Sequence, residues 1–207
     1  MCYSFESSIG AWFISFIFCS YMLANPDKYD NWIPLFVLTF TQIQIIEALL
    51  WTNINNKSVN SAVTAMLPMM LLLQPLMNSY LAYTHTKNQM FIYAMVLYGI
   101  AILYTYQAAR NDTFNTTVGP NGHLVWNRYD ENNNSVDIFD SKIIAVIYLL
   151  GLIVPFFFME APIKYLPISV AILTFSMSAL FYKEEFSSWW CYISVSLAFI
   201  AVLFPKK

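Results

Sequence analysis

The chain has 207 residues, of which 58% are hydrophobic and only 11% are charged, and its formal net charge is −2. Soluble domains carry about 25% charged residues, so a soluble domain of this length would lack the polar surface that must face water. Ten Lys and Arg residues against twelve Asp and Glu residues also give no basic surface for nucleic acid. The composition therefore predicts a membrane protein whose partner is the lipid bilayer, and it excludes nucleic-acid binding.

Seven apolar runs are long enough to cross the core of a bilayer, which is about 30 Å thick and takes roughly 17–25 helical residues. The runs are continuous rather than alternating in polarity, which is typical of helices and excludes a closed β-barrel. We predict one all-α transmembrane domain over residues 1–207, a polytopic bundle of about seven helices. Six or eight helices are the alternatives, because residues 162–188 could form a re-entrant hairpin. The predicted spans are 7–24, 32–51, 63–83, 90–106, 143–159, 166–182 and 189–204.

Seven spans place the two ends of the chain on opposite sides of the membrane, and the charges beside the spans indicate the orientation. Short loops on the cytoplasmic side carry an excess of Lys and Arg. The short joints on the side of the N-terminus hold only Lys57 and Lys183. We therefore expect an external or lumenal N-terminus and a cytoplasmic C-terminus. The basic residues on the cytoplasmic side are then Lys28, Lys87, Lys164, Lys206 and Lys207.

The segment 107–141 is too long to be a simple connection between helices, and it falls on the external side in this orientation. It contains sequons for N-glycosylation at Asn111, Asn115 and Asn133, which agree with an external position. The sequence thus predicts a glycoprotein with a long external loop.

Part of this loop has the pattern of a β-hairpin. Residues 119–122 (Gly-Pro-Asn-Gly) are a turn signal. Leu124, Val125 and Trp126 are strand formers, and residues 136–139 could pair with them across an Asn-rich turn. We expect a small hairpin between the fourth and fifth helices, over the external mouth of the bundle. A disordered, glycosylated loop is the alternative.

Two cysteines, Cys2 and Cys191, fall at the predicted external ends of the first and last spans. A closed ring of helices would bring these ends together, so a disulfide is expected in an oxidising compartment. Cys19 lies deeper and is expected to stay reduced. Separate thiols are the alternative, as is acylation of Cys2 if the N-terminus is cytoplasmic.

The second span carries polar residues well inside an apolar run. Thr41, Gln44, Glu47 and Trp51 follow spacings of three and four, so they share one face of a helix, and Gln42 points away from it. A carboxyl inside a membrane is costly when charged, so an intramembrane Glu is a functional-site hypothesis by default. The alternative is a protonated or hydrogen-bonded Glu47 that only holds helices together.

The third span adds Gln74 and Asn78, one helical turn apart. Pro75 between them frees the Leu71 carbonyl, which must find a partner inside the bundle. We expect Gln74 to join Glu47 in one polar site, whereas helix packing is the favoured role of Asn78.

The chain lacks the residue sets of several other sites. The two histidines, His85 and His123, both fall in joints, so we predict no metal site of the intramembrane hydrolase type. The last span has no lysine that could hold retinal. We expect no cofactor, and no enzyme activity is expected because a nucleophile or metal set is missing.

Several short motifs occur together along the chain. They are residues 1–4 (Met-Cys-Tyr-Ser), Gln44-x-x-Glu47 followed by Trp51, residues 73–76 (Leu-Gln-Pro-Leu), residues 121–126 (Asn-Gly-His-Leu-Val-Trp) and residues 190–191 (Trp-Cys). The set resembles an uncharacterised family of short polytopic membrane proteins of large DNA viruses and microbial eukaryotes that begin Met-Cys-x-Ser. The resemblance covers nearly the whole chain. It implies a single intact membrane domain of viral or microbial type and no particular activity.

Our first functional hypothesis is an integral membrane protein that binds or moves a small molecule, an ion or a proton. Its site would lie around Glu47, Gln44 and Gln74, with Asn78 and Trp51 nearby, in the external half of the bundle. The second hypothesis is a structural or interaction protein without a ligand, whose polar residues serve only helix packing. The third is an intramembrane enzyme that uses Glu47 as an acid and base.

Overall fold

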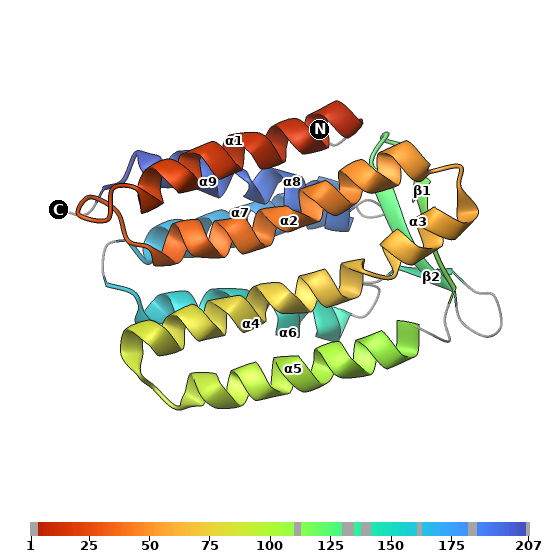
Figure 1. The fold of residues 1–207 in the computed structure, drawn as a ribbon. Helices are drawn as coiled ribbons and strands as arrows, with labels where there is room; N and C mark the ends of the chain where they lie inside the picture. The colour runs from red at the N-terminus through yellow and green to blue at the C-terminus, as the bar shows by residue number, and fades with distance from the viewer. Residues whose placement is uncertain are drawn as a thin grey trace.

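The computed structural model describes residues 4–109, 113–129, 135–137, 142–160, 163–181 and 186–205. Figure 1 shows helices that run back and forth along a common axis, with a small sheet at one end of the bundle, which we call the sheet end. The helices of the described residues make seven passes, as the apolar runs predicted. In chain order they are α1 (Phe5–Leu23), α2 (Trp32–Asn53), α3 (Lys57–Thr64) leading into α4 (Leu67–Thr86), α5 (Met90–Ala109), α6 (Lys142–Ile153) with the 3-10 helix η1 (Val154–Phe158), α7 (Tyr165–Phe181), and α8 (Phe186–Ser194) with α9 (Ser196–Val202).

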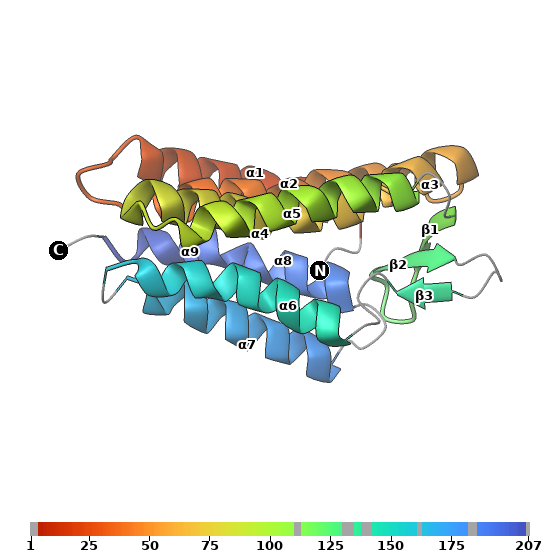
Figure 2. The same ribbon diagram turned by 90° about the horizontal axis from the view of Figure 1, so that it is seen from below.

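The passes form two layers. Figure 2 shows α1, α2, α4 and α5 in one layer and α6, α7, α8 and α9 in the other. The first layer holds the segments that are long and apolar enough to cross a membrane: Phe5–Leu23, Trp32–Asn53, Lys57–Thr86 and Met90–Gln107. The second layer holds three shorter apolar segments of 10–17 residues, Val146–Phe158, Tyr165–Phe181 and Ser188–Val202. The four long helices are thus of transmembrane length, whereas the predicted spans 143–159, 166–182 and 189–204 are shorter as regular helices.

Two passes of the second layer are interrupted. Pro155 has no N–H, and the helical pattern changes from α6 to the tighter η1 at this point. The last pass breaks at Val195, whose N–H donates to the Tyr192 carbonyl at 3.2 Å, three residues back. The break at Val195 divides the last predicted span into the two short helices α8 and α9.

Local sequence accounts for the ends of several helices in the first layer. Ser4 and Ser7 form a reciprocal capping box at the start of α1, in which each backbone N–H donates to the other side chain at 3.3 Å. Pro68 lies in the first turn of α4, where its missing N–H costs nothing. The same helix ends at Lys87, whose left-handed φ of 56° turns the chain toward α5. Helix α4 thus begins and ends a few residues later than the predicted span 63–83, and the short helix α3 precedes it.

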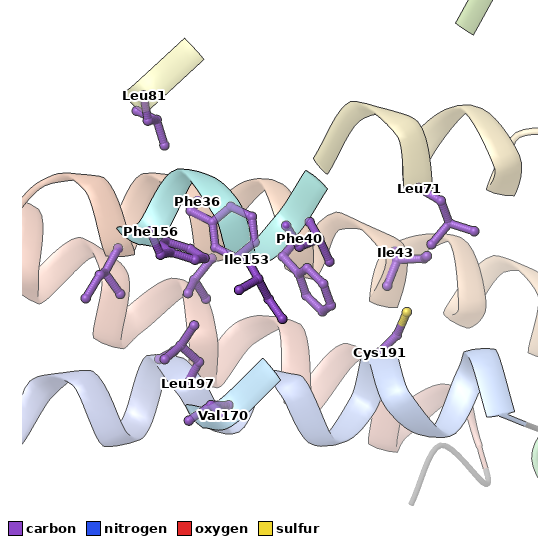
Figure 3. Close-up of a cluster of buried hydrophobic side chains, with 14 of the residues drawn as sticks. Phe36, Phe40, Ile43, Leu71, Leu81, Ile153, Phe156, Val170, Cys191 and Leu197 are labelled. Carbon is purple, nitrogen blue, oxygen red and sulfur yellow. The ribbon is translucent and has the colours of Figure 1, made fainter. Parts of the chain in front are cut away.

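The hydrophobic core lies between the two layers and combines aliphatic with aromatic side chains (Figure 3). Phe36 of α2 packs edge-on against Phe156 of η1, with ring centroids 5.1 Å apart. Phe40, one turn along α2, packs against Trp190 of α8 at 6.1 Å. These contacts join the central helix of the first layer to the interrupted helices of the second.

Helix α5 has an opposite environment at the edge of the first layer. Only 6% of its apolar window Met90–Gln107 is buried, and the exposed side chains include Leu97, Leu103 and Tyr104. α5 packs mainly on α4. An apolar helix exposed over nearly its whole circumference is compatible with a lipid bilayer around it.

The described part of the long loop forms a small antiparallel sheet, so the alternative of a disordered loop is wrong for this part. Its strands are β1 (Thr113–Val118), β2 (Leu124–Tyr129) and β3 (Ser135–Asp137), in the order β1-β2-β3. The predicted turn is present, because Gly122 has a positive φ of 79° and its N–H donates to the Gly119 carbonyl at 3.0 Å. The predicted pairing is corrected, since residues 124–126 pair with the unexpected strand β1, and β3 pairs with the later residues 127–129.

The sheet is fastened to the bundle by one buried asparagine of α3. The Asn60 Nδ2 donates to the Thr116 carbonyl at 2.9 Å, and the Asn60 Oδ1 accepts from the Thr116 N–H at 2.7 Å. Thr64, one turn along α3, places its hydroxyl 2.7 Å from that of Thr116. We call α3, β1, β2 and the turn 119–123 the cap. It lies at the end of the bundle where α1 begins, as expected for the predicted hairpin (Figures 1 and 2).

Candidate functional site

The polar face predicted for the second span is buried in the structure. Thr41, Gln44 and Glu47 of α2 are each 0% exposed, and Trp51 packs partly against the core. Gln42 lies on another face, where its Nε2 donates to the Leu38 carbonyl of its own helix at 2.7 Å. The helical spacing therefore identified the buried side correctly.

Four helices place polar side chains at the same depth below the sheet end. Glu47 lies six residues before the end of α2, and Gln74 lies seven residues after the start of α4. Tyr148 and Cys191 lie six and five residues after the starts of α6 and α8. At 1.5 Å per residue these positions are about 8–11 Å from the helix ends. Antiparallel packing thus brings these residues into one layer of the bundle.

Contacts connect these residues to one another. The Tyr148 hydroxyl donates to the Gln74 Oε1. Cys191 lies close enough to both Tyr148 and Glu47 for electrostatic interaction. We call Glu47, Gln74, Tyr148 and Cys191 the Glu47 cluster; Gln44 lies one turn deeper on α2. All of these side chains are buried, so the cluster is a polar centre inside an apolar bundle.

Cys191 corrects one sequence prediction. It is a free, buried thiol, and Figure 3 shows it beside Ile43 in the core. The expected disulfide with Cys2 is therefore not formed, because α8 begins before Cys191 and turns its side chain into the bundle. Cys2 itself lies outside the described residues. Cys19 is also a free, buried thiol, as predicted.

Asn78 is part of a different arrangement from Gln74. Its Oδ1 accepts from the Trp32 Nε1 at 2.6 Å, and its Nδ2 donates to the Leu152 carbonyl at 2.7 Å. That carbonyl would meet the N–H of Pro155 in the 3-10 pattern, but proline has none. Asn78 therefore satisfies the backbone at the break in the fifth pass, a packing role.

Below the Glu47 cluster the neighbours are aromatic. Trp190 packs edge-on against Tyr148 with ring centroids 5.4 Å apart, and its Nε1 donates to the Thr174 hydroxyl of α7 at 3.0 Å. A cavity of about 20 Å³ lies farther along, lined mainly by Phe36, Phe40, Phe156, Val170, Trp190 and Leu197. Ligand pockets for small molecules measure several hundred Å³, so this apolar space is far too small for one.

Gly151 allows the helices around Tyr148 to approach closely. A Cβ at this position would lie 1.9 Å from the Tyr98 hydroxyl of α5 and 3.0 Å from the Pro75 Cβ of α4. Tyr98 in turn lies close enough to Tyr148 for electrostatic interaction. The glycine thus lets α4, α5 and α6 meet beside the cluster.

The two histidines are both outside the cluster. His123, in the turn of the cap, stacks on Trp189 of α8 with ring centroids 5.2 Å apart, and it is fully buried. Burial lowers the pKa of His123 to about 4, so this ring is neutral at neutral pH. His85 packs near Trp32 at the opposite end. Among the described residues no group of three or more His, Cys, Asp and Glu could hold a metal ion.

Sequence reasoning missed Tyr148 and assigned Cys191 another role. A single tyrosine in an apolar run resembles the many other aromatic residues of this chain, and only its position one turn before Gly151 distinguishes it. Of the three sequons, Asn115 lies half-buried on β1, whereas Asn111 and Asn133 lie outside the described residues.

Comparison with models of protein families, with curated proteins and with solved structures finds no match to this chain. Its function is therefore inferred from the geometry of its own residues. The most informative feature is a carboxyl group enclosed by neutral polar side chains.

Proposed function

We propose that this chain is an integral membrane protein of seven transmembrane passes in which Glu47 reversibly binds a proton. The observation that carries the proposal is the position of Glu47, which is fully buried about 9 Å from the sheet end of its helix and interacts electrostatically with the buried Cys191. A buried carboxyl is held more easily in its neutral form, so it can take up and release a proton as its surroundings change.

A proton fits this site better than a larger ligand. The cluster side chains are all buried, and the nearby cavity of about 20 Å³ is apolar. A proton needs only hydrogen-bonding groups, which Gln44, Gln74, Tyr148 and Cys191 supply around the carboxyl. We infer that the protein moves protons, or couples its conformation to one, and that the amides orient the carboxyl.

A matched pair of variants tests this proposal. Glu47→Gln keeps a near-isosteric hydrogen-bonding side chain but cannot bind a proton, whereas Glu160→Gln removes an exposed carboxyl outside the helices. Proton flux into liposomes, read with a pH-sensitive dye, is expected to fall about tenfold or more in Glu47→Gln and to stay at the wild-type level in Glu160→Gln. Infrared spectra should show a protonated-carboxyl band that is lost only in Glu47→Gln. Wild-type flux in Glu47→Gln would overturn the proposal.

The second candidate function is a structural membrane protein without a ligand. Asn78 supports it, because both ends of that amide are engaged in bonds between helices. Under this alternative Glu47→Gln would be silent in flux and stability, and Glu47→Leu would only lower stability by leaving its polar neighbours without a partner.

We further propose that the cap and the start of α1 face the external or lumenal side and that the C-terminus is cytoplasmic, as the charges beside the spans indicate. The resemblance to membrane proteins of large DNA viruses and microbial eukaryotes agrees with a multi-pass protein of this kind. Glycosylation tests the orientation, because external sequons at Asn111, Asn115 or Asn133 would be modified in a eukaryotic host. Endoglycosidase should then increase the mobility of the protein, and cleavage of the cap by protease added only on the cytoplasmic side would contradict this orientation.

A further inference from the structure

A distinct set of buried polar atoms lies between the Glu47 cluster and the cap. The Ser188 side chain is 0% exposed, and its Oγ has no hydrogen-bond partner among the described residues. The buried Nε1 of Trp51 also lacks a partner there. A buried polar group without a partner costs free energy, so such groups in a native structure commonly mark ordered water.

Helical spacing places both groups directly above the cluster. Ser188 precedes Cys191 by three residues, so the two share a face of α8, with Ser188 one turn closer to the cap. Trp51 follows Glu47 by four residues and shares its face of α2, again one turn closer to the cap. Since α2 and α8 pack together, these four residues form two successive polar levels between the helices.

The cap covers the upper level. Trp189 follows Ser188 directly and stacks on His123 of the turn 119–123, and strand β2 contacts α8. The polar levels therefore reach from the Glu47 cluster to the part of the molecule that lies beyond the helix ends.

On the side of the cluster away from the cap, the neighbouring polar groups are hydrogen-bonded and the small cavity is lined by apolar side chains. The indole N–H of Trp190 is engaged by Thr174, and Asn78 has partners for both of its polar atoms. All six buried side-chain atoms that lack a partner among the described residues lie in the half nearer the sheet. They are Ser8 Oγ, Trp12 Nε1, Trp51 Nε1, Gln74 Nε2, Trp126 Nε1 and Ser188 Oγ.

We infer that a narrow chain of water molecules connects the cap to the Glu47 cluster between α2 and α8, with the Ser188 hydroxyl and the Trp51 indole N–H as its hydrogen-bonding partners. The chain of water molecules ends at Cys191 and Glu47 and does not continue toward the opposite end of the bundle. The role of this path rests on the proposed function: it lets Glu47 exchange its proton with the cap side only. Ser188 is then a positioning residue for water.

The two buried thiols of the chain provide a direct test with D2O as the probe. Cys191 lies at the end of the proposed water path and Cys19 lies away from it in α1, yet both are 0% exposed. In infrared spectra of the full chain in lipid, transfer to D2O converts each S–H band to S–D, and Cys191→Ser and Cys19→Ser assign the two bands. The Cys191 band is expected to convert at least about tenfold faster than the Cys19 band, because local opening alone limits the latter.

Substitutions on the two sides of Cys191 locate the path. Ser188→Leu fills the space on the cap side and should slow Cys191 exchange to the rate of Cys19, whereas Ser188→Ala, which removes only the hydroxyl that holds the water, should slow it by about threefold. Ala198→Val adds volume on the side away from the cap and should have no effect. Trp51→Phe, which keeps the ring and removes the N–H, is a milder second variant expected to slow exchange by about threefold.

Several outcomes would overturn the inference. They are equal exchange of Cys191 and Cys19, wild-type exchange in both Ser188→Leu and Trp51→Phe, and slowing by Ala198→Val equal to that by Ser188→Leu. The result is separate from the fate of the proposed function. Fast Cys191 exchange with wild-type flux in Glu47→Gln would keep the water path and reject the proton site, and slow exchange with lost flux would do the reverse.

Discussion

Two amides one turn apart on α4 have different environments. Asn78 uses both of its polar atoms in bonds to Trp32 and to the Leu152 carbonyl, whereas Gln74 accepts from Tyr148 and its buried Nε2 has no partner among the described residues. The same contrast extends to the two halves of the bundle. Away from the cap the buried amide of Asn78 and the indole N–H of Trp190 are both hydrogen-bonded between helices, whereas nearer the cap Ser188 Oγ and Trp51 Nε1 have no partner among the described residues. Burial alone therefore does not separate a packing residue from a site residue, but the use of its polar atoms does.

The largest effect is expected from a substitution at Asn78, whose two polar side-chain atoms are both hydrogen-bonded. Asn78→Leu should lower the free energy of unfolding by about 3 kcal/mol, because it strands both the Trp32 N–H and the Leu152 carbonyl in an apolar interior. Gln74→Leu should cost about half as much, since only the Tyr148 hydroxyl loses a partner. Thermal unfolding in the same lipid or detergent measures both. An equal or larger loss in Gln74→Leu would contradict the contrast between the two amides.

A glycine pair tests how tightly the helices meet beside the cluster. Gly151→Ala should destabilise the protein by about 2 kcal/mol, because the new methyl group would collide with the Tyr98 hydroxyl and press on Pro75. Gly99→Ala on α5 is the control, since nothing lies within 4 Å of its added Cβ. That change should be neutral or stabilise the helix by up to about 1 kcal/mol. Similar melting temperatures for the two variants would mean that Tyr98 does not occupy this site.

Within the cap, the attachment of strand β1 to α3 should depend mainly on the Asn60 side chain. Asn60→Ala removes both bonds to the Thr116 backbone and should weaken local protection of β1 by about 1–2 kcal/mol, with little change in the helices. Asn53→Ala, at the end of α2, should change stability by less than about 0.5 kcal/mol. Hydrogen exchange of the β1 amides measures this loss of protection. Unchanged β1 protection in Asn60→Ala would show that the two Asn60–Thr116 bonds, which we call the Asn60 clamp, are dispensable.

The most local effect is a pH dependence confined to the cap. The docked His123 takes up a proton only near its pKa of about 4, whereas an undocked histidine does so near 6.5. Docking is therefore fully stable above about pH 6.5 and loses stability as the pH falls from about 6.5 to 4, where the undocked state binds more protons. The protection factors of the β2 amides, which correct for the intrinsic exchange rate at each pH, should fall over this range in the wild type and in His85→Phe. His123→Phe should abolish the pH dependence, and a persisting slope there would assign it to another group.

The passes of the bundle could be predicted from the sequence because apolar runs of sufficient length leave few alternatives in a membrane protein. The buried face of α2 was also accessible, since Thr41, Gln44 and Glu47 repeat at helical spacing. Membership of the cluster was not, because Tyr148 and Cys191 are brought to it only through the packing of α6 against α4 and of α8 against α2. A lone tyrosine or cysteine in an apolar run carries no local sign of its neighbours.

The cap shows the same limit at a smaller scale. Strand β1 alternates buried and exposed residues, with Phe114 and Thr116 inward, but its threonines and asparagine also fit a glycosylated loop. The sequence indicated the turn at residues 119–122 correctly. It did not indicate that β2 pairs with β1, the strand that precedes it in the chain, as well as with β3. Pairing with the nearer β1 allowed a six-residue register, whereas β3 contributes three residues.

The Asn60 clamp also settles what becomes of an open sheet edge. Strand β1 is one of the two outer strands in the order β1-β2-β3, and the N–H and carbonyl of Thr116 that face away from β2 are groups that another chain would use to add a strand at this edge. Asn60 occupies both of them from within the molecule. A single amide on α3 thereby protects the cap against edge-to-edge association between neighbouring copies in a crowded membrane.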